Sequence, residues 1–119
     1  MYTPEKHQTL LQECQQWHDE LDACTARIHV MKNELYQFAP GKTDHDVMMG
    51  IEHFHNQFHI QLINVHDLSH KIKYHLREAK QHPELGPRVE HHRIKDDLDL
   101  LLGDCKTLDE EFHAFISKP

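Results

Sequence analysis

Apolar residues recur at alternating spacings of three and four through almost the whole of this 119-residue chain. The pattern occupies three segments, about 4–38, 43–81 and 87–117, and clustered helix breakers lie between them, at Pro40-Gly41 and at Pro83 to Pro87. Such heptads, without β-type alternation, predict long coiled-coil-like helices that pack at shallow angles. Because short connections make consecutive helices antiparallel neighbours, we expect an all-α, antiparallel three-helix bundle that forms a single domain over residues 1–119.

Each segment supplies one row of the predicted core. The rows, in chain order, are Leu10, Cys14, Trp17, Leu21, Cys24, Ile28, Met31, Leu35 and Phe38; Val47, Ile51, Phe54, Phe58, Gln61, Val65, Leu68, Ile72, His75 and Ala79; and His91, Ile94, Leu98, Leu101, Cys105, Leu108, Phe112 and Phe115. Folding the chain at its two connections predicts four layers: Trp17 with Leu68 and Leu101, Leu21 with Val65 and Cys105, Ile28 with Phe58 and Phe112, and Met31 with Phe54 and Phe115. Local pattern and topology agree, as in a chain that specifies one fold.

Further apolar residues predict self-association. They lie on the second and third predicted helices at neighbouring heights: Phe58, Ile60, Leu62, Ile63, Val65, Leu100 and Leu102. A contiguous apolar patch on a small bundle is typical of an interface between copies, whereas scattered surface leucines are ordinary in monomers. We therefore expect a homodimer.

Histidine is the most unusual part of the composition, with 14 residues in the chain. Four of them form two HxxxH pairs on one flank of the second predicted helix: His55, His59, His66 and His70. Residues four apart lie one turn apart on the same helix face, where two imidazoles can share one ion. Because imidazole is the commonest protein metal ligand, these four side chains are the primary ligands of a predicted metal site.

Ligands from a neighbouring helix would complete this site. If the first and second helices meet at the flank, two groups result: His29 with His55 and His59, and His18 with Asp22, His66 and His70. If the second and third helices meet there instead, Asp109 and His113 replace the ligands of the first helix; the sequence leaves both arrangements open. Nitrogen and oxygen ligands on rigid helices suit Zn²⁺, Cu²⁺, Ni²⁺ or Fe²⁺. The alternative is a solvated histidine-rich flank that binds metal only adventitiously.

A second imidazole group is predicted at the end of the bundle near Pro83. His75 and His91 occupy row positions, and His7 extends the row of the first helix. All three would point inward within two adjacent layers and could hold one ion. The alternative is a set of satisfied polar groups near fraying helix ends.

Two Glu-x-x-His triplets, Glu52 to His55 and Glu110 to His113, have the ligand spacing of ferritin-like di-iron bundles. Those bundles use four helices and additional Glu ligands, whereas this chain predicts three helices with the triplets at different heights. Di-iron chemistry is therefore the weaker alternative.

Composition argues against several other functions. The formal charge of −7 opposes nucleic-acid binding through a basic face. With no apolar leader segment and no stretch as long as a membrane span, we expect a cytoplasmic protein that does not contact membranes. The cysteines, Cys14, Cys24 and Cys105, lack CxxC spacing and are odd in number, which predicts reduced thiols. The chain has no phosphate loop, nucleophile elbow or catalytic-triad spacing that would indicate an enzyme.

The stretch Glu52-His-Phe-His-Asn-Gln-Phe58, continued by Leu68-Ser-His70-Lys-Ile72, carries a Phe-x-Asn-x-Phe and a His-x-Ile pattern. It resembles a group of short, three-segment helical proteins from Bacteroidetes that have a similar length. The resemblance implies a three-helix fold and no particular activity. Of the four flank histidines, only His70 matches the pattern of the group.

These patterns predict a non-enzymatic metal-binding bundle that stores, buffers or senses a divalent transition metal. The alternative is a helical interaction or adaptor protein without metal, in which the histidines act at most as a pH sensor. The alternative is considered because the sequence specifies the apolar core rows more clearly than it specifies any metal site.

Overall fold

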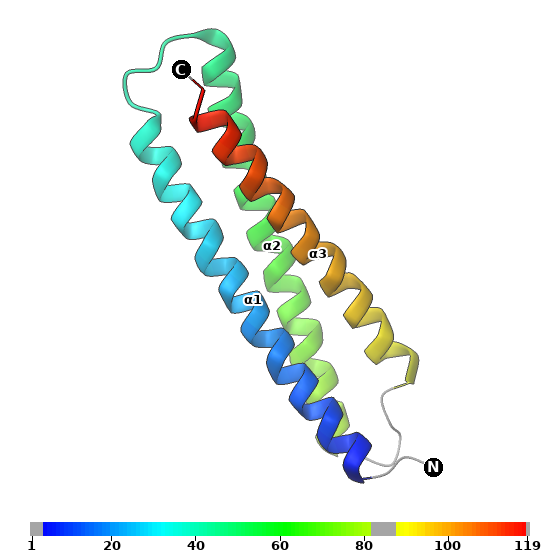
Figure 1. The fold of residues 1–119 in the computed structure, drawn as a ribbon. Coiled ribbons are helices and arrows are strands. Elements are labelled where there is room, and N and C mark those ends of the chain that lie inside the picture. The colour runs from blue at the N-terminus through cyan, green and yellow to red at the C-terminus, as the bar shows by residue number, and fades with distance from the viewer. Residues whose placement is uncertain (1–3, 82–87, 119) are drawn as a thin grey trace.

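The computed structural model describes residues 4–81 and 88–118, with the side chains of residues 8–81 and 91–118. This part of the chain forms the helices α1 (Pro4–Phe38), α2 (His45–Gln81) and α3 (Arg88–Ile116). They lie side by side in an elongated bundle of 63 × 18 × 18 Å (Figure 1). The predicted all-α class and three-helix bundle are confirmed, whereas the predicted breaker cluster at Pro83 to Pro87 lies outside the described residues.

The connection between α1 and α2 sets the height at which α2 begins. Asp44 caps α2: its Oδ1 accepts hydrogen bonds from the backbone N–H groups of Asp46 and Val47, at 2.9 and 3.2 Å. Gly41 has a φ of 82°, in the left-handed region that glycine adopts without steric cost. Figure 1 shows the connection rising beyond the end of α1 to reach the first turn of α2.

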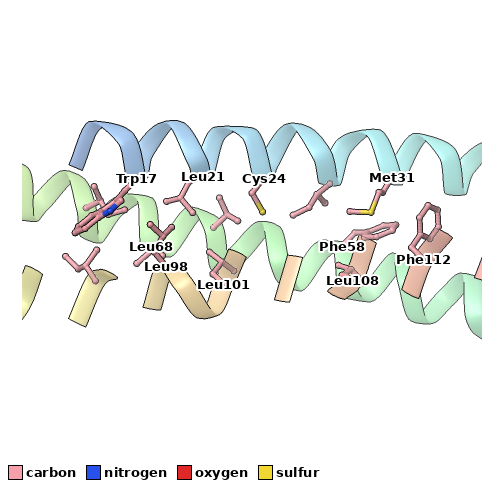
Figure 2. Packing of buried hydrophobic residues seen from close by; sticks show 14 of the residues in the cluster. Trp17, Leu21, Cys24, Met31, Phe58, Leu68, Leu98, Leu101, Leu108 and Phe112 are labelled. Carbon is pink, nitrogen blue, oxygen red and sulfur yellow. The ribbon is translucent and has the colours of Figure 1, made fainter. Parts of the chain in front are cut away.

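The core rows predicted from the sequence lie inside the bundle. The largest fully buried side chains include Phe58, Phe112, Leu10, Leu21 and Ile28. Figure 2 shows labelled side chains from all three helices converging on the space between them. The described polar side chains that share this interior are Gln61, His75 and His91.

Aromatic contacts define the register of α2 against α3. The ring centroid of Phe54 lies 5.1 Å from that of Phe115, and Phe58 lies 5.1 Å from Phe112. Both pairs are those predicted by folding the chain at the second connection, so this part of the predicted layering is confirmed.

Helix α1 lies one turn or more away from its predicted register. The prediction placed Trp17 level with Leu101, Leu21 level with Cys105, and Met31 level with Phe115. The structure forms different pairs: Trp17 with His91 (ring centroids 4.5 Å apart), Cys24 with Cys105, and Phe38 with Phe115 (5.5 Å). The prediction was wrong because it assumed a tight reversal after α1, whereas α2 begins beyond the end of α1 (Figure 1).

Cys24 and Cys105 form a disulfide that joins α1 to α3, with Cα atoms 6.9 Å apart. The expectation of three reduced thiols is therefore wrong for this pair, because the register of α1 brings the two side chains face to face. Cys14 is the free cysteine, and it is buried. The cytoplasmic location remains a prediction that no longer draws support from the cysteines.

The apolar surface is smaller than predicted. Phe58 and Val65 belong to the core, and Leu62 and Leu102 are half-buried against it. The residues left exposed from the predicted patch are Ile60, Ile63 and Leu100, with exposed fractions of 46%, 47% and 69%. Within the described part of the chain, no helix has the length and apolar character needed to cross a membrane.

Candidate metal centre

Cys14, His75 and His91 come together inside the bundle, one from each helix. Their exposed fractions are 0%, 8% and 7%. The Sγ atom of Cys14 and one ring nitrogen of each histidine lie within 4.8 Å of one another. Thiolate sulfur and imidazole nitrogen are the ligands that zinc and other borderline ions take in proteins. The three helices therefore supply a candidate metal centre, here called the buried cluster.

The two histidines of the buried cluster already stand at a separation suited to a shared ion. His75 Nε2 lies 3.1 Å from His91 Nδ1. Two imidazole nitrogens bound to one tetrahedral Zn²⁺ stand about 3.3 Å apart, given Zn–N distances of about 2.0–2.1 Å. The observed separation is therefore close to the one that a shared ion would impose.

Two side chains of α1, Glu13 and Trp17, contact the ring of His91. Glu13 Oε2 lies 2.9 Å from His91 Nε2, the ring nitrogen that points away from His75. The ring of Trp17 lies 4.5 Å from the His91 ring, with 32° between the two planes. A carboxylate on the outer nitrogen of a ligating histidine fixes the orientation and tautomer of the ring. Glu13 thus leaves Nδ1 of His91 directed toward the cluster.

The environment of Cys14 favours a ligand over a nucleophile. Burial, together with the charge of Glu13, raises the pKa of the Cys14 thiol to about 11. Cysteine, histidine and glutamate side chains in one place are also found around catalytic nucleophiles. Here the Cys14 thiol is fully buried and protonated, so it does not meet a substrate from solvent. A bound metal ion would displace the thiol proton, because thiolate is the form that coordinates.

The sequence named two of these three ligands in its second imidazole group and not among the primary ligands on the flank of α2. His75 and His91 were expected to share a site, but with His7, whose side chain lies outside the described residues. Cys14 stands one heptad after His7, so the error in the register of α1 accounts for the exchange. The sequence did contain a signal: Cys14 and His7 occupy the same heptad position, and a shift of two turns brings the cysteine level with the two histidines.

The histidine flank of α2 is exposed. His55, His59, His66 and His70 all lie on the surface. The rings of His66 and His70 are neighbours, with centroids 4.5 Å apart, and the His55 ring lies 6.2 Å from that of Tyr36 in α1. The contact with Tyr36 shows that His55 lies on the side of α2 that faces α1.

Neither of the predicted groups on this flank assembles three ligand atoms. Within the described residues, the groups that do so are the buried cluster and His18 with Asp19 and Asp22. His18 Nδ1 lies 3.3 Å from Asp22 Oδ2 on the same helix. His18 is half-buried and both carboxylates are exposed, as is His29. Solvated groups along one helix are common on surfaces without a metal.

His113 lies between α3 and α1 and not beside the histidine flank. Its Nε2 is 3.1 Å from Glu34 Oε2 of α1, and its Nδ1 is 2.8 Å from the carbonyl oxygen of Asp109. Arg27 of α1 donates two hydrogen bonds of 2.9 Å to the carboxylate of Asp109. The alternative arrangement that placed His113 beside His55 and His59 is therefore not formed in this structure, because α3 turns this side chain toward α1.

Comparison of the chain with protein-family models, curated proteins and solved structures finds no match. A functional assignment therefore depends on the geometry and chemistry of the described side chains. By that measure the buried cluster stands first, since all its ligand-type residues are buried and converge from separate helices.

Proposed function

We propose that this protein is a non-enzymatic metal-binding bundle that holds one divalent transition-metal ion at Cys14, His75 and His91. The observation that carries the proposal is the convergence of these three buried side chains, with their ligand atoms within 4.8 Å of one another. Ligand-type residues are common on a surface, but their burial in one place is not expected from core packing alone.

The position of the cluster suggests how an ion would act. Because each ligand comes from a different helix, an ion at this position links α1, α2 and α3 at one end of the bundle. Metal that binds only the folded chain stabilises it by an amount that grows with the logarithm of its free concentration above Kd. The stability of the bundle would then report the supply of the metal, as storage, buffering or sensing requires.

Calorimetric titration of chelator-stripped protein with Zn²⁺ tests this proposal. The disulfide between Cys24 and Cys105 is kept intact so that Cys14 is the available thiol. We expect one ion per chain and a loss of affinity of ~100-fold or more in Cys14→Ala, since a thiolate ligand is removed from the site. The double variant His66→Ala/His70→Ala serves as the control, because it removes an exposed histidine pair and leaves the cluster intact.

The opposite pattern would reject the proposed site. If Cys14→Ala binds Zn²⁺ like the unmodified chain, while His66→Ala/His70→Ala does not, the exposed flank of α2 is the binding site. If neither variant alters the affinity, the chain has no specific metal centre, and a role as an interaction module becomes the better account.

We also propose that the chain forms a homodimer through the exposed apolar residues of α2 and α3. The support is the exposure of Ile60, Ile63 and Leu100, which are large apolar side chains on two neighbouring helices. Sedimentation at micromolar concentration should give a dimer, and Leu100→Glu combined with Ile63→Glu should give a monomer. A monomer at every concentration of the unmodified chain would refute the dimer and leave the metal site untouched.

A further inference from the structure

The charge of the ligands in the buried cluster limits which metal ions it can hold. A metal ion in the core must be neutralised by nearby charge, because an uncompensated charge in an apolar interior is strongly unfavourable. Cys14 supplies one negative charge when it coordinates, and the two imidazoles must be neutral to bind metal. A divalent ion with these ligands alone would leave one positive charge buried.

Glu13 supplies the charge that completes the balance. Its Oε2 lies 2.9 Å from His91 Nε2, on the side of the ring away from His75. The side chain of His91 is 9% exposed and that of Glu13 is 40% exposed, so the carboxylate acts on the site from the edge of the bundle, across a largely buried ring. A divalent ion, one thiolate and one carboxylate sum to zero, whereas a monovalent ion in the same site leaves one negative charge.

The hydrogen bond between Glu13 and His91 adds an orienting effect to this charge. A carboxylate only accepts hydrogen bonds, so the proton of neutral His91 resides on Nε2 and the lone pair on Nδ1. That lone pair points toward His75 Nε2, and an ion would be bound by these two nitrogens together. Glu13 is thus a positioning residue, placed behind the ligand and not coordinated to the ion.

We propose that Glu13 makes the buried cluster selective for a divalent borderline ion such as Zn²⁺ over monovalent Cu⁺, by neutralising the site through His91. This inference rests on the proposed metal function. Sulfur and nitrogen ligands already disfavour hard cations such as Mg²⁺ and Ca²⁺, which take oxygen ligands. By charge, the thiolate alone favours Cu⁺, because a monovalent ion and one thiolate already sum to zero; the added carboxylate of Glu13 shifts the balance to Zn²⁺.

The test compares Zn²⁺ and Cu⁺ affinities in the unmodified chain and in Glu13→Gln. The glutamine keeps the size of the side chain and an oxygen acceptor for His91 Nε2 but removes the charge. Competition with a chromophoric chelator is carried out under argon, with Cu⁺ supplied as its acetonitrile complex so that no thiol reductant opens the disulfide. We expect Glu13→Gln to weaken Zn²⁺ binding by about 10–100-fold and to leave Cu⁺ binding equal or tighter.

Glu20→Gln is the matched control, because Glu20 stands one heptad further along α1 and accepts a hydrogen bond from Gln16. It changes the net charge equally and should leave both affinities unchanged. Glu13→Asp retains the charge and should retain the preference for Zn²⁺. Far-ultraviolet circular dichroism of each metal-free variant verifies that the bundle has formed.

The outcomes separate this inference from the proposed function. If Cys14→Ala abolishes Zn²⁺ binding but Glu13→Gln affects both ions equally, or neither, the charge-balancing role is refuted and the metal site stands. If Cys14→Ala binds Zn²⁺ like the unmodified chain, the proposed function itself is refuted, and the inference with it.

Discussion

His75 Nε2 and His91 Nδ1 lie 3.1 Å apart across the interface of α2 and α3, inside the bundle. The outer nitrogen of His91 meets Glu13 at 2.9 Å, so the three side chains form a continuous line of polar contacts. The ionised carboxylate of Glu13 can only accept a hydrogen bond, so neutral His91 must donate to it through Nε2. His91 Nδ1 must then accept the hydrogen bond from His75.

The metal-free protein should therefore hold both histidines in a defined tautomer. At mildly alkaline pH we expect His91 to carry its proton on Nε2, donating to Glu13, and His75 to carry its proton on Nε2, donating to His91 Nδ1. Nitrogen-15 NMR of the imidazole rings distinguishes the two nitrogens and measures this directly. A proton on Nδ1 of neutral His91 would contradict the assignment, and with it the preorganisation of that nitrogen for metal.

Two helical glycines should respond in opposite directions to alanine. A Cβ atom at Gly50 would overlap the ring of Phe115, whereas a Cβ at Gly103 meets nothing within 4 Å. Overpacking costs about 1–3 kcal/mol, which outweighs the gain in helix propensity at Gly50. We expect Gly50→Ala to lower the free energy of unfolding by roughly 1–2 kcal/mol and Gly103→Ala to raise it by up to about 1 kcal/mol. Urea unfolding measures both; a stabilising Gly50→Ala would mean that the Phe115 ring moves aside at little cost.

The ion-pair network of His113 should make the bundle more stable under mildly acidic conditions. The backbone carbonyl of Asp109, and then the carboxylates of Asp109 and Glu34, raise the pKa of His113 above 6.5. The hydrogen bond from Arg27 holds the pKa of Asp109 below 3.8. The contribution of His113 is complete below pH 6.5 and is lost as pH rises through its raised pKa; that of Asp109 is present above pH 3.8 and is lost below it.

The stabilising window of this network thus lies between about pH 4 and pH 6.5. We expect His113→Gln to destabilise the chain more at pH 5.5 than at pH 8, by roughly 0.5 kcal/mol once solvent screening of this half-exposed group is allowed for. Urea unfolding at the two values measures the difference, and His29→Gln, on the exposed surface of α1, is the control. An equal effect at both values would show that His113 acts by packing and not by charge.

Reduction of the disulfide should weaken the bundle considerably. Cys24 and Cys105 are separated by 81 residues in the chain, so their bond removes much of the freedom of the unfolded state. Chain entropy for a loop of this length gives up to about 4.5 kcal/mol, and disulfides typically stabilise proteins by about 2–4 kcal/mol. A phosphine reductant should lower the urea midpoint of the metal-free chain, and the effect should vanish in Cys105→Ser. Thiol titration of the unreduced, denatured chain should count Cys14 alone; three reactive thiols would disprove the bond.

The spacing of apolar residues determined the three helices, their bounds and the inward face of each one. This was possible because helical periodicity and breaker residues are local properties, and the heptad rows from Leu10 to Phe38 and from His91 to Phe115 express them without interruption. The register of α2 against α3 also followed, since Phe54 and Phe58 could be paired with Phe115 and Phe112 by counting from the connection.

The position of α1 along the bundle was decided by tertiary structure alone. It depends on the path of the connection through Gly41 and on the packing of the whole interface, neither of which is encoded in a local pattern. A shift of one to two turns exchanged His7 for Cys14 beside His75 and His91, and it placed Cys24 against Cys105. The sequence determined which side chains point inward; which of them meet, and hence what chemistry the core can perform, was determined only when the helices packed.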